Sequence, residues 1–488
     1  MSQQAAPSPR APASASFRRS AWVLFGAAFA IRLLALWASG DAGELVKDEI
    51  NYVQRANALL DGEGYLGSYQ SWVRHDPAPL SERPQYPGAF QPPAYPTFLA
   101  AVLAATGRST QAVQVVQCAL SAATCVLLLA LGRAWVGARA ARVAGWTAAV
   151  YPNLIAFSHY FWTETFFTFV LLALFAVLFA GGGGLVSMRR AAAAGVVLAV
   201  GALTRSTLLW FAPVLVLFMA LLDEGATGWP RLGAVRWRPA LARGGAMIGV
   251  ALALIAPWTI RNWLVHDGFV LIDTNAPYNL WRGNAPGAML MASQPQAPRY
   301  GWPFQRIVMH PVANLNGPVL VAKYRQAHPD DPMPTDLALT RYASEVAWAQ
   351  IRGRPDRALA NAWQKLVDMW NPTSFLLRHF ELGAYGPVSP AVRMAASAAA
   401  VVSYLAVALL AVVGLAAGLH DRRMWLVLAF VGYLSAVSAL AFGLTRFRIP
   451  LMPLLMLPAA AALERLVTPR GRAATPSAAS SPPGEPAV

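Results

Sequence analysis

Residues 110–132 read TQAVQVVQCALSAATCVLLLALG, a stretch that contains no Asp, Glu, Lys or Arg. A helix needs about 20 predominantly apolar residues to cross the hydrocarbon core of a bilayer, and this stretch supplies them without interruption. Further apolar stretches recur on both sides of it, separated by short connectors. The sequence therefore predicts an all-α polytopic membrane protein.

The composition supports a membrane protein and argues against two other classes. Hydrophobic residues make up 56% of the 488 residues and charged residues 13%, whereas a soluble domain carries about 25% charged residues. The net charge of +16 does not indicate a nucleic-acid partner, because the Arg residues lie in short connectors rather than on one soluble domain. Cys118 and Cys125 lie inside the quoted stretch and predict small core side chains, not a disulfide or a metal cluster.

Ten membrane spans follow from the apolar stretches. They are predicted near 21–38, 110–132, 139–157, 162–180, 190–204, 207–222, 244–260, 396–418, 424–443 and 448–466. Residues 93–107 form a shorter apolar stretch, which we interpret as re-entrant or interfacial; a crossing there would give eleven spans instead. With ten spans, the connectors that contain Arg133, Arg189 and Arg231 all face the cytoplasm, as the positive-inside rule requires.

The longer polar segments divide the chain into parts. We predict a disordered cytoplasmic tail over 1–19, an N-terminal transmembrane module over 20–260 with a periplasmic loop over 39–92, a second periplasmic or interfacial loop over 261–395, C-terminal transmembrane helices over 396–467 and a disordered cytoplasmic tail over 468–488. Trp363 and Trp370 indicate that a helix over 358–370 lies at the membrane interface, where Trp is favoured.

Ionisable residues gather at the predicted outer ends of the spans. They are Lys47, Asp48, Glu49, His159, Glu164, Arg205, Arg261, Arg446 and Arg448. Charged groups in or beside spans are costly, so a function is expected for them. Asp48 and Glu164 have the alternative interpretations of a helix N-cap and a first-turn acid favoured by the helix dipole. His159 has the alternative interpretation of a polar turn residue rather than a metal ligand, and Arg205 that of a side chain which reaches lipid headgroups.

Two acids and several Arg side chains at one membrane face match a particular chemistry. A carboxylate can take the proton of an acceptor group, and guanidinium groups bind and stabilise a departing phosphate. Tyr52 lies one helical turn after Asp48, on the same face. The pattern favours attack on a sugar that is attached to a lipid phosphate, with Asp48 as the general base.

Several short motifs carry a resemblance to a known family. They are Asp48-Glu49-Ile50-Asn51-Tyr52, Leu60-Asp61-Gly62-Glu63-Gly64-Tyr65, Pro92-Pro93-Ala94-Tyr95-Pro96, Tyr151 to Glu164, Thr204-Arg205, Pro257 to Asn262, Gly283-Asn284 and Arg446 to Pro450. Their order resembles that in bacterial GT-C glycosyltransferases of the protein-mannosyltransferase and aminoarabinose-transferase type, which are family 39-like. The sequence departs from that pattern where Lys47 precedes the acids and where Glu49 replaces the Asp of some relatives.

The resemblance implies a GT-C bundle of about 10–11 transmembrane helices and a polyprenyl-phosphate-linked sugar donor. It also implies transfer to a glycolipid, glycan or protein acceptor at the periplasmic face of the bacterial inner membrane. By position, Asp48 would be the catalytic carboxylate, with Glu49 and Glu164 as supporting acids. Donor and acceptor contacts would come from Lys47, Tyr52, Tyr95, His159, Arg205, Arg261, Arg446 and Arg448. The acids would admit a divalent metal, but no ligand spacing demands one.

The sequence thus favours single-displacement transfer with inversion, and it leaves two rivals. A transporter or flippase of lipid-linked sugars would place charges at the bilayer midplane and show internal repeats, whereas here the charges lie at the outer boundary. An enzyme of the O-antigen-ligase kind would use Arg and His residues of the second loop, for example Arg282. No residue identifies the sugar or the acceptor.

Overall fold

The computed structural model describes residues 15–39, 45, 48–67, 86–181, 186–231, 233, 235–285, 317–331, 333–381, 385–386 and 388–468. Lys47 and most of the two predicted tails lie outside these residues. The first helix begins at Ala15, inside the segment predicted as a disordered tail. Its first turns are held against the bundle, because the guanidinium of Arg133 lies 4.9 Å from the ring centre of Phe17.

The first half of the chain alternates long helices with short outer elements. In order these are α1 (Ala15–Ala38), α2 (Asp48–Leu60), β1 (Leu66–Gly67), β2 (Tyr86–Pro87), α4 (Ala94–Ala105), α5 (Thr110–Trp135), α6 (Ala138–Val150), α7 (Pro152–Phe157), α8 (Thr163–Phe179), α9 (Met188–Ala202), α10 (Thr207–Trp210), α11 (Ala212–Glu224) and α12 (Trp237–His266). The two strands pair antiparallel, with Leu66 opposite Pro87.

The second half begins with outer helices and returns to the bundle. In order these are α13 (Asn275–Asn284), α14 (Gly317–Ala327), α15 (Asp336–Gly353), α16 (Pro355–Trp370), α17 (Phe375–Glu381), α18 (Pro390–Ala417), α19 (Arg422–Leu440), the 3₁₀ helix η3 (Thr445–Leu451) and α20 (Met452–Val467).

The predicted class, an all-α polytopic membrane protein, is confirmed. Six of the described helical segments are long and apolar enough to cross a membrane, namely α1, α5, α12, α18, α19 and η3 with α20. The predicted spans at 139–157, 162–180, 190–204 and 207–222 are also helical, but α6, α8, α9 and α11 contain only 13, 17, 15 and 13 residues. The number of crossings, ten or eleven, stays a prediction. Helix α4 has 12 residues and therefore extends only about 18 Å, which is shorter than the hydrocarbon core of a bilayer. This length favours ten crossings.

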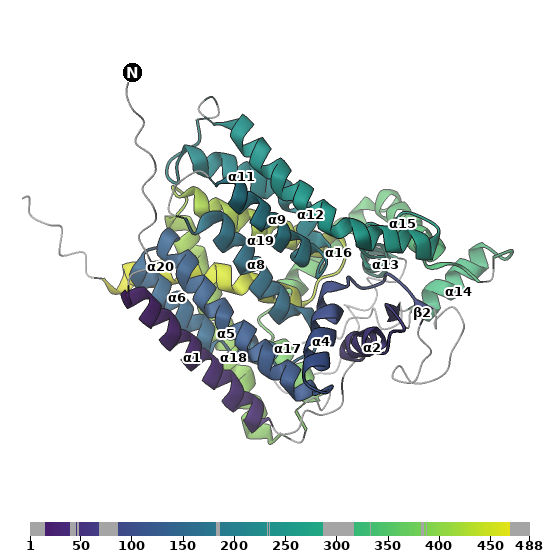
Figure 1. Ribbon diagram of the computed structural model, residues 1–488, viewed down its shortest axis with the longest axis horizontal. Coiled ribbons are helices and arrows are strands. Elements are labelled where there is room, and N and C mark those ends of the chain that lie inside the picture. The colour runs from purple at the N-terminus through teal and green to yellow at the C-terminus, as the bar shows by residue number, and fades with distance from the viewer. Residues whose placement is uncertain are drawn as a thin grey trace, which may run out of the picture.

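The bundle is layered around α5, which packs against α1, α6 and α8 (Figure 1). On one side α20 packs between α18 and α6, and on the other α9 packs between α8 and α12. The backbones of α18 and α20 touch, since a Cβ on Gly414 would lie 1.9 Å from the carbonyl oxygen of Pro458. Glycine is therefore needed at that crossing.

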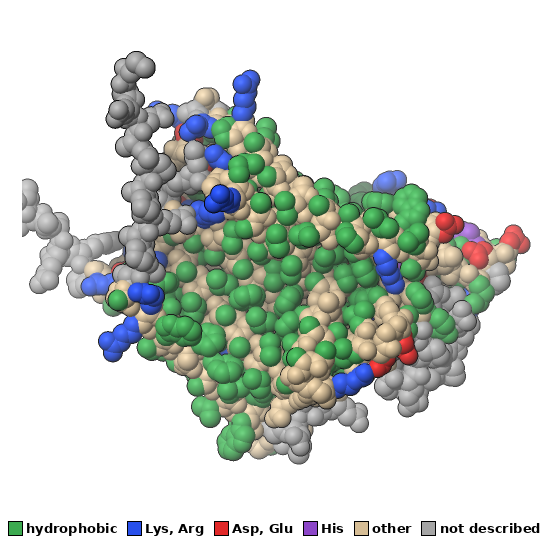
Figure 2. All heavy atoms as spheres, viewed as in Figure 1, with side chains coloured by type: hydrophobic (Ala, Val, Ile, Leu, Met, Phe, Trp, Pro, Cys, Tyr) green, Lys and Arg blue, Asp and Glu red, His purple; other side chains and the backbone are tan. Residues whose placement is uncertain are grey.

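The two ends of the molecule differ in chemistry. At the right of Figure 1 lie α2, β2, α13, α14 and α15. A second hydrophobic core forms there, with Trp281 of α13, Val321 of α14 and Leu339 of α15. Figure 2 shows Lys and Arg side chains gathered at the opposite end, with a broad apolar face between the two ends. That distribution agrees with a bundle whose basic end faces the cytoplasm.

Arg32 lies fully buried within the apolar helix α1. Its Nη1 donates to the carbonyl of Ala149 at 3.1 Å and its Nη2 to that of Ala148 at 3.3 Å. These carbonyls lie in the last turn of α6, which stops because Pro152 follows it and begins α7. Arg32 therefore caps a broken helix inside the bundle and supplies donors to buried carbonyls that have no partner within their own helix.

We expect Arg32→Met to lower the free energy of unfolding by about 2–4 kcal/mol, because it leaves two buried carbonyls without donors. A shift of the thermal midpoint in detergent measures this loss. Arg18→Met is the matched control, since Arg18 is on the same helix but exposed. Equal midpoints for the two variants would contradict the capping role.

Candidate active site

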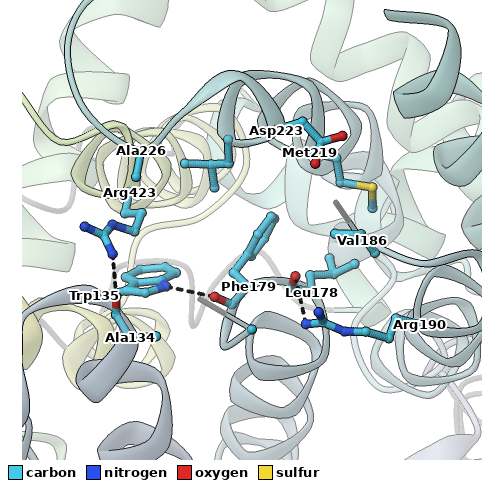
Figure 3. A pocket seen from close by; sticks show the side chains of 12 residues that line it. Ala134, Trp135, Leu178, Phe179, Val186, Arg190, Met219, Asp223, Ala226 and Arg423 are labelled. Carbon is cyan, nitrogen blue, oxygen red and sulfur yellow. Dashed lines mark hydrogen bonds between the residues drawn. The ribbon is translucent and has the colours of Figure 1, made fainter. Parts of the chain in front are cut away.

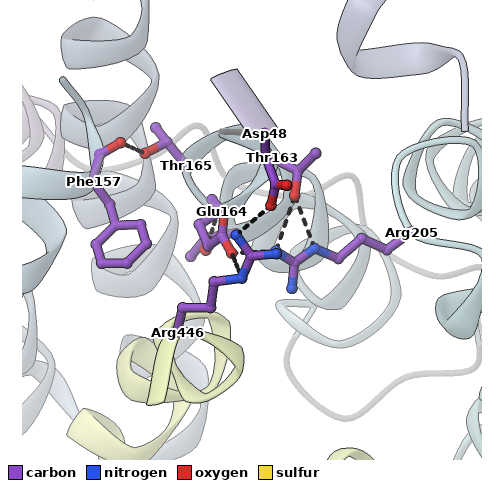
Figure 4. Close-up of polar contacts among 8 residues, drawn as sticks. Asp48, Phe157, Thr163, Glu164, Thr165, Arg205 and Arg446 are labelled. Carbon is purple, nitrogen blue, oxygen red and sulfur yellow. Dashed lines mark hydrogen bonds and ion pairs between the residues drawn. The ribbon is translucent and has the colours of Figure 1, made fainter. Parts of the chain in front are cut away.

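Four charged residues from distant parts of the chain meet at the end of the bundle where α8 begins (Figure 4). Asp48 is the first residue of α2 and Glu164 the second residue of α8. Arg205 lies in the turn between α9 and α10, and Arg446 lies in η3. These four were among the predicted site residues, and we call them the acid–arginine cluster.

Arg446 lies between the two acids. Its Nη1 is 2.9 Å from Oδ2 of Asp48, and its Nε is 3.7 Å from Oε1 of Glu164. The guanidinium also lies over the rings of Trp162 and Phe447, with its carbon 4.7 and 5.5 Å from the ring centres. Aromatic faces attract cations and leave a guanidinium edge free for hydrogen bonds, so Arg446 is held in place while it contacts both acids.

Arg205 is the second cation of the cluster. Its Nη2 lies 2.6 Å from Oε1 of Glu164. Its Nε and Nη2 donate to Oγ1 of Thr163 at 3.0 and 2.9 Å, and its guanidinium carbon lies 5.2 Å from the ring centre of Phe167. The first turn of α8 therefore supplies one hydroxyl and one carboxylate to the same guanidinium.

The two acids of the cluster differ in exposure. The side chain of Glu164 is 1% exposed and contacts both arginines, whereas that of Asp48 is 42% exposed. Two carboxylates and two guanidiniums give the cluster no net charge. Asp48 is thus the acid of the cluster that solvent can reach, and Glu164 contacts both arginines.

Glu49, Tyr52 and Tyr95 make contacts that join α2 to its neighbours in the bundle. Glu49 is buried and its Oε1 accepts a hydrogen bond from the backbone N–H of Phe161 at 3.0 Å. The rings of Tyr52 and Tyr95 meet edge to face at 5.1 Å, and the hydroxyl of Tyr95 donates to Gln117. Burial raises the pKa of Tyr52, and the neighbouring Asp48 raises it further. These side chains fix α2 against the bundle.

The structure does not bring Arg448, Arg261 or His159 into the cluster. Arg448 donates to the carbonyls of Met369, Asn371 and Thr373 at the end of α16, and it is buried. Its guanidinium therefore joins protein elements, and in this arrangement it does not face the acids.

Arg261 and His159 also bond to the backbone. Arg261 donates to the carbonyls of Gly88 and Tyr65 at 2.7 and 2.9 Å, so it holds the small sheet against α12. The Nε2 of His159 lies 3.0 Å from the carbonyl oxygen of Arg32. Burial lowers the pKa of His159 to about 4, so its ring stays neutral.

Sequence reasoning missed Trp162 and Thr163, which contact Arg446 and Arg205 directly. In the sequence, the one indication for these two residues was that they directly precede Glu164. Sequence reasoning also gave no site role to Tyr278 of α13. Burial raises the pKa of Tyr278, while Arg282 lowers it and Asp48 raises it. Among the described residues, no group of three or more His, Cys, Asp or Glu could hold a metal.

The Gly283-Asn284 motif joins α13 to the bundle. A Cβ on Gly283 would lie 1.8 Å from the carbonyl oxygen of Ala441, so only glycine fits there. The amide of Asn284 donates to the carbonyl of Leu440 at 2.8 Å and accepts from Nζ of Lys365 at 3.1 Å. Lys365 also donates to the carbonyls of Ala439 and Leu440 at the end of α19, and burial lowers its pKa to about 7.

We expect Gly283→Ala to displace α13 and to lower the free energy of unfolding by about 1–3 kcal/mol, because backbone atoms must move to make room. Thermal unfolding in detergent measures the loss. Gly245→Ala is the control, since a Cβ at that helical glycine of α12 meets nothing within 4 Å. A destabilisation that is no larger than in the control would reject the close packing.

The membrane bundle with its outer helices has the GT-C fold, as the motifs of the sequence implied. The archaeal oligosaccharyltransferase AglB from Archaeoglobus fulgidus, in complex with an inhibitory peptide and a dolichol-phosphate, matches 94% of this chain and 52% of its own with a TM-score of 0.51 and 12% identity. The same enzyme tethered to an acceptor peptide matches with a TM-score of 0.50 and 12% identity, over 92% of this chain and 49% of its own.

This chain therefore spans about half the length of the oligosaccharyltransferase structures. A looser likeness, with a TM-score of 0.40 and 16% identity, covers 91% of this chain and 78% of ArnT from Cupriavidus metallidurans bound to undecaprenyl phosphate. No protein-family model and no curated protein sequence matches the chain. The similarity in structure establishes the fold. Any proposal about a reaction has to be argued from the acid–arginine cluster.

Proposed function

We propose that this protein transfers a sugar from a polyprenyl-phosphate carrier to an acceptor at the outer face of the membrane. The observation that carries the proposal is the acid–arginine cluster, which combines an accessible carboxylate with two arginines held by a buried acid. A general base and a cationic site for a leaving phosphate are the two elements that such a transfer needs.

In the proposed reaction, Asp48 removes the proton of the acceptor nucleophile as this attacks the anomeric carbon of the sugar. The bond between that carbon and the phosphate oxygen breaks on the opposite side, so the configuration inverts. The lipid phosphate leaves with the bonding electrons, and Arg205 and Arg446 stabilise its negative charge. The proton stays on Asp48 until solvent removes it.

In this proposal Arg446 takes part in two steps, since it contacts the base Asp48 and also stabilises the leaving phosphate. In the structure it is paired with Asp48 at 2.9 Å, which favours the ionised carboxylate but occupies one of its oxygens. A donor phosphate that takes Arg446 as its partner would break this ion pair with Asp48. Donor binding would then prepare the base for the acceptor.

The proposed location follows from the charges. The cluster lies at the first turn of α8, whereas the Arg-rich connectors lie at the other end of the bundle. By the positive-inside rule the cluster faces the periplasm of a bacterial inner membrane. The oligosaccharyltransferase of the same fold contains a dolichol-phosphate, which supports a polyprenyl-type phosphate lipid as the donor carrier and a glycolipid, glycan or protein as acceptor.

The proposal is tested with purified protein in proteoliposomes that contain radiolabelled polyprenyl-phosphate sugars and an envelope extract as acceptor. We expect label transfer by the native protein, its loss in Asp48→Ala, and partial retention in Arg282→Ala. Loss in Arg282→Ala with full activity in Asp48→Ala would instead indicate the ligase-type alternative. Absence of transfer by the native protein with every polyprenyl-phosphate sugar would reject the proposal. Mass spectrometry of envelope glycans from a deletion strain identifies the sugar and the acceptor.

A further inference from the structure

A short connector, residues 441–444, joins the end of α19 to η3 beside the helices α13 and α16 (Figure 1). Lys365 of α16 is buried there, and its Nζ donates to the carbonyls of Ala439 and Leu440 at 3.1 Å each. It also donates to the side-chain oxygen of Asn284 in α13 at 3.1 Å. An ammonium group has three N–H donors, so Lys365 uses all of them to join α16, α19 and α13.

The backbone of this α19–η3 connector is in close contact with both outer helices. A Cβ on Gly443 would lie 2.1 Å from the carbonyl oxygen of Lys365. A Cβ on Gly283 would lie 1.8 Å from the carbonyl oxygen of Ala441. Backbones can approach this closely only where glycine removes the side chain. The connector is therefore packed against α16 through Gly443 and against α13 through Ala441.

Helix α16 also holds the chain on the far side of Arg446. Arg448 donates to the carbonyls of Met369 and Thr373, at and just beyond the end of α16. Arg446 thus lies between two attachments to the same helix, Lys365 before it and Arg448 after it. The helix rises only about 6 Å from Lys365 to Met369. The position of η3 is therefore set by α16 at both of its ends.

Arg446 depends on the position of η3 because its contacts are short. Its Nη1 lies 2.9 Å from Oδ2 of Asp48, and its Nε lies 3.7 Å from Oε1 of Glu164. A displacement of about 1 Å takes a hydrogen bond of this length beyond its useful range. A misplacement of about 1 Å at reacting groups can lower a rate about 10²-fold. A contact that fixes the connector therefore bears on the acid–arginine cluster.

Capping of α19 explains only part of these contacts. Cations are favoured at helix C-termini, where they satisfy the last carbonyls. Figure 3 shows such bonds near the end of α8 remote from the cluster, where Arg190 donates to the carbonyl of Leu178 and Arg423 to that of Ala134. Lys365 does more than a cap requires, because it also bonds to α13 and its own backbone packs against the connector.

We propose that Lys365 is a positioning residue for Arg446. It holds the α19–η3 connector against α16 and α13, so that η3 places the guanidinium of Arg446 beside Asp48 and Glu164. The donors of Lys365 are taken by protein oxygens, so it acts through Arg446 and not on a substrate. The placement of Arg446 is argued from the structure alone, whereas an effect on a lipid phosphate rests on the proposed function.

Hydrogen exchange of the purified full chain in detergent, read by mass spectrometry, tests the placement without a substrate. Lys365→Met keeps an unbranched side chain but removes the three donors. We expect the amides of η3 to exchange about tenfold faster, since hydrogen bonds that hold the connector are lost, and the amides of α5 to be unchanged. Lys323→Met is the matched control, because Lys323 lies on α14, is partly exposed and should leave η3 unchanged.

A second pair of variants leaves the buried ammonium in place. Gly443→Ala puts a methyl group against the carbonyl of Lys365, and it should raise the exchange of η3 in the same way. Gly432→Ala is its control, because a Cβ at this glycine of α19 meets nothing within 4 Å. Unchanged exchange of η3 in Lys365→Met would overturn the proposal. Equal increases in α5 and η3, in both Lys365→Met and Gly443→Ala, would also overturn it.

Binding of undecaprenyl phosphate, followed as a saturating shift of the unfolding midpoint, tests whether Lys365 acts through Arg446. We expect Lys365→Met to weaken the apparent affinity about fivefold, and to cause no further loss when Arg446→Gln is already present. Equal losses in the two backgrounds would overturn a positioning role. If the native protein does not bind this lipid, the proposed donor is wrong, and hydrogen exchange alone decides the role of Lys365.

Discussion

Asp48→Asn is expected to reduce sugar transfer about 10²–10⁴-fold, the range that general-base catalysis supplies. Asparagine keeps the size of the side chain but cannot accept a proton. Asp48 is 42% exposed and has one carboxylate oxygen 2.9 Å from Arg446. The loss should therefore lie in the chemical step, with little effect on folding.

Initial rates in proteoliposomes measure this loss, and thermal unfolding in detergent checks the fold. Asp61→Asn is the matched control, because Asp61 follows the same helix α2 and is paired with the exposed Arg108. It should keep its activity. Asp48→Glu should retain a fraction of the rate, since a carboxylate remains. A fully active Asp48→Asn would remove Asp48 from the mechanism and leave the fold assignment intact.

The helices of the bundle could be predicted from the sequence because each needs a long apolar stretch, and such a stretch is visible without knowledge of its neighbours. The acids were found for a related reason. A carboxylate next to an apolar helix is conspicuous, and the positive-inside rule places Asp48 and Glu164 at one face although 116 positions separate them in numbering.

The roles of the arginines could not be predicted in the same way. Arg446 and Arg448 are two positions apart, and the sequence presents them as equivalent. They lie in η3, a 3₁₀ helix with three residues per turn, so their side chains leave on different sides. Arg446 meets the acids, whereas Arg448 meets carbonyls at the end of α16. Residues two positions apart leave a helix of either type on different sides, whereas they share one face of a strand. The helical conformation of η3 therefore decides this difference, and the short segment Thr-Arg-Phe-Arg-Ile-Pro does not reveal it.

Arg32 shows a second limit of the sequence. It lies within an apolar helix, where the pattern indicates only a costly charge. Its partners are carbonyls of α6, more than a hundred positions further along the chain. Backbone acceptors carry no sequence signal, so the cap becomes visible only after the two helices are packed together.

Glu164→Gln is expected to lower the free energy of unfolding by about 2–4 kcal/mol, because it removes the acid that two arginines share in a site of low exposure. Glu164 is 1% exposed, with Arg205 at 2.6 Å and Arg446 at 3.7 Å. The variant leaves these guanidiniums with only Asp48 as a carboxylate partner in the cluster. Thermal unfolding in detergent should show a clear drop of the midpoint, whereas Asp48→Asn should show a small one.

Because Glu164→Gln removes a negative charge, the effect of the lost charge can be tested separately from an effect of lost packing. Undecaprenyl phosphate supplied to the variant should raise its unfolding midpoint more than that of the native protein, because the lipid phosphate replaces the absent carboxylate. The double variant Glu164→Gln with Arg205→Gln should also recover part of the stability, since it removes one unpaired cation together with the acid. If neither the lipid phosphate nor the second substitution recovers stability, Glu164 acts through packing alone. The two arginines would then not form a preformed phosphate site, and the donor would have to be bound elsewhere on the outer face.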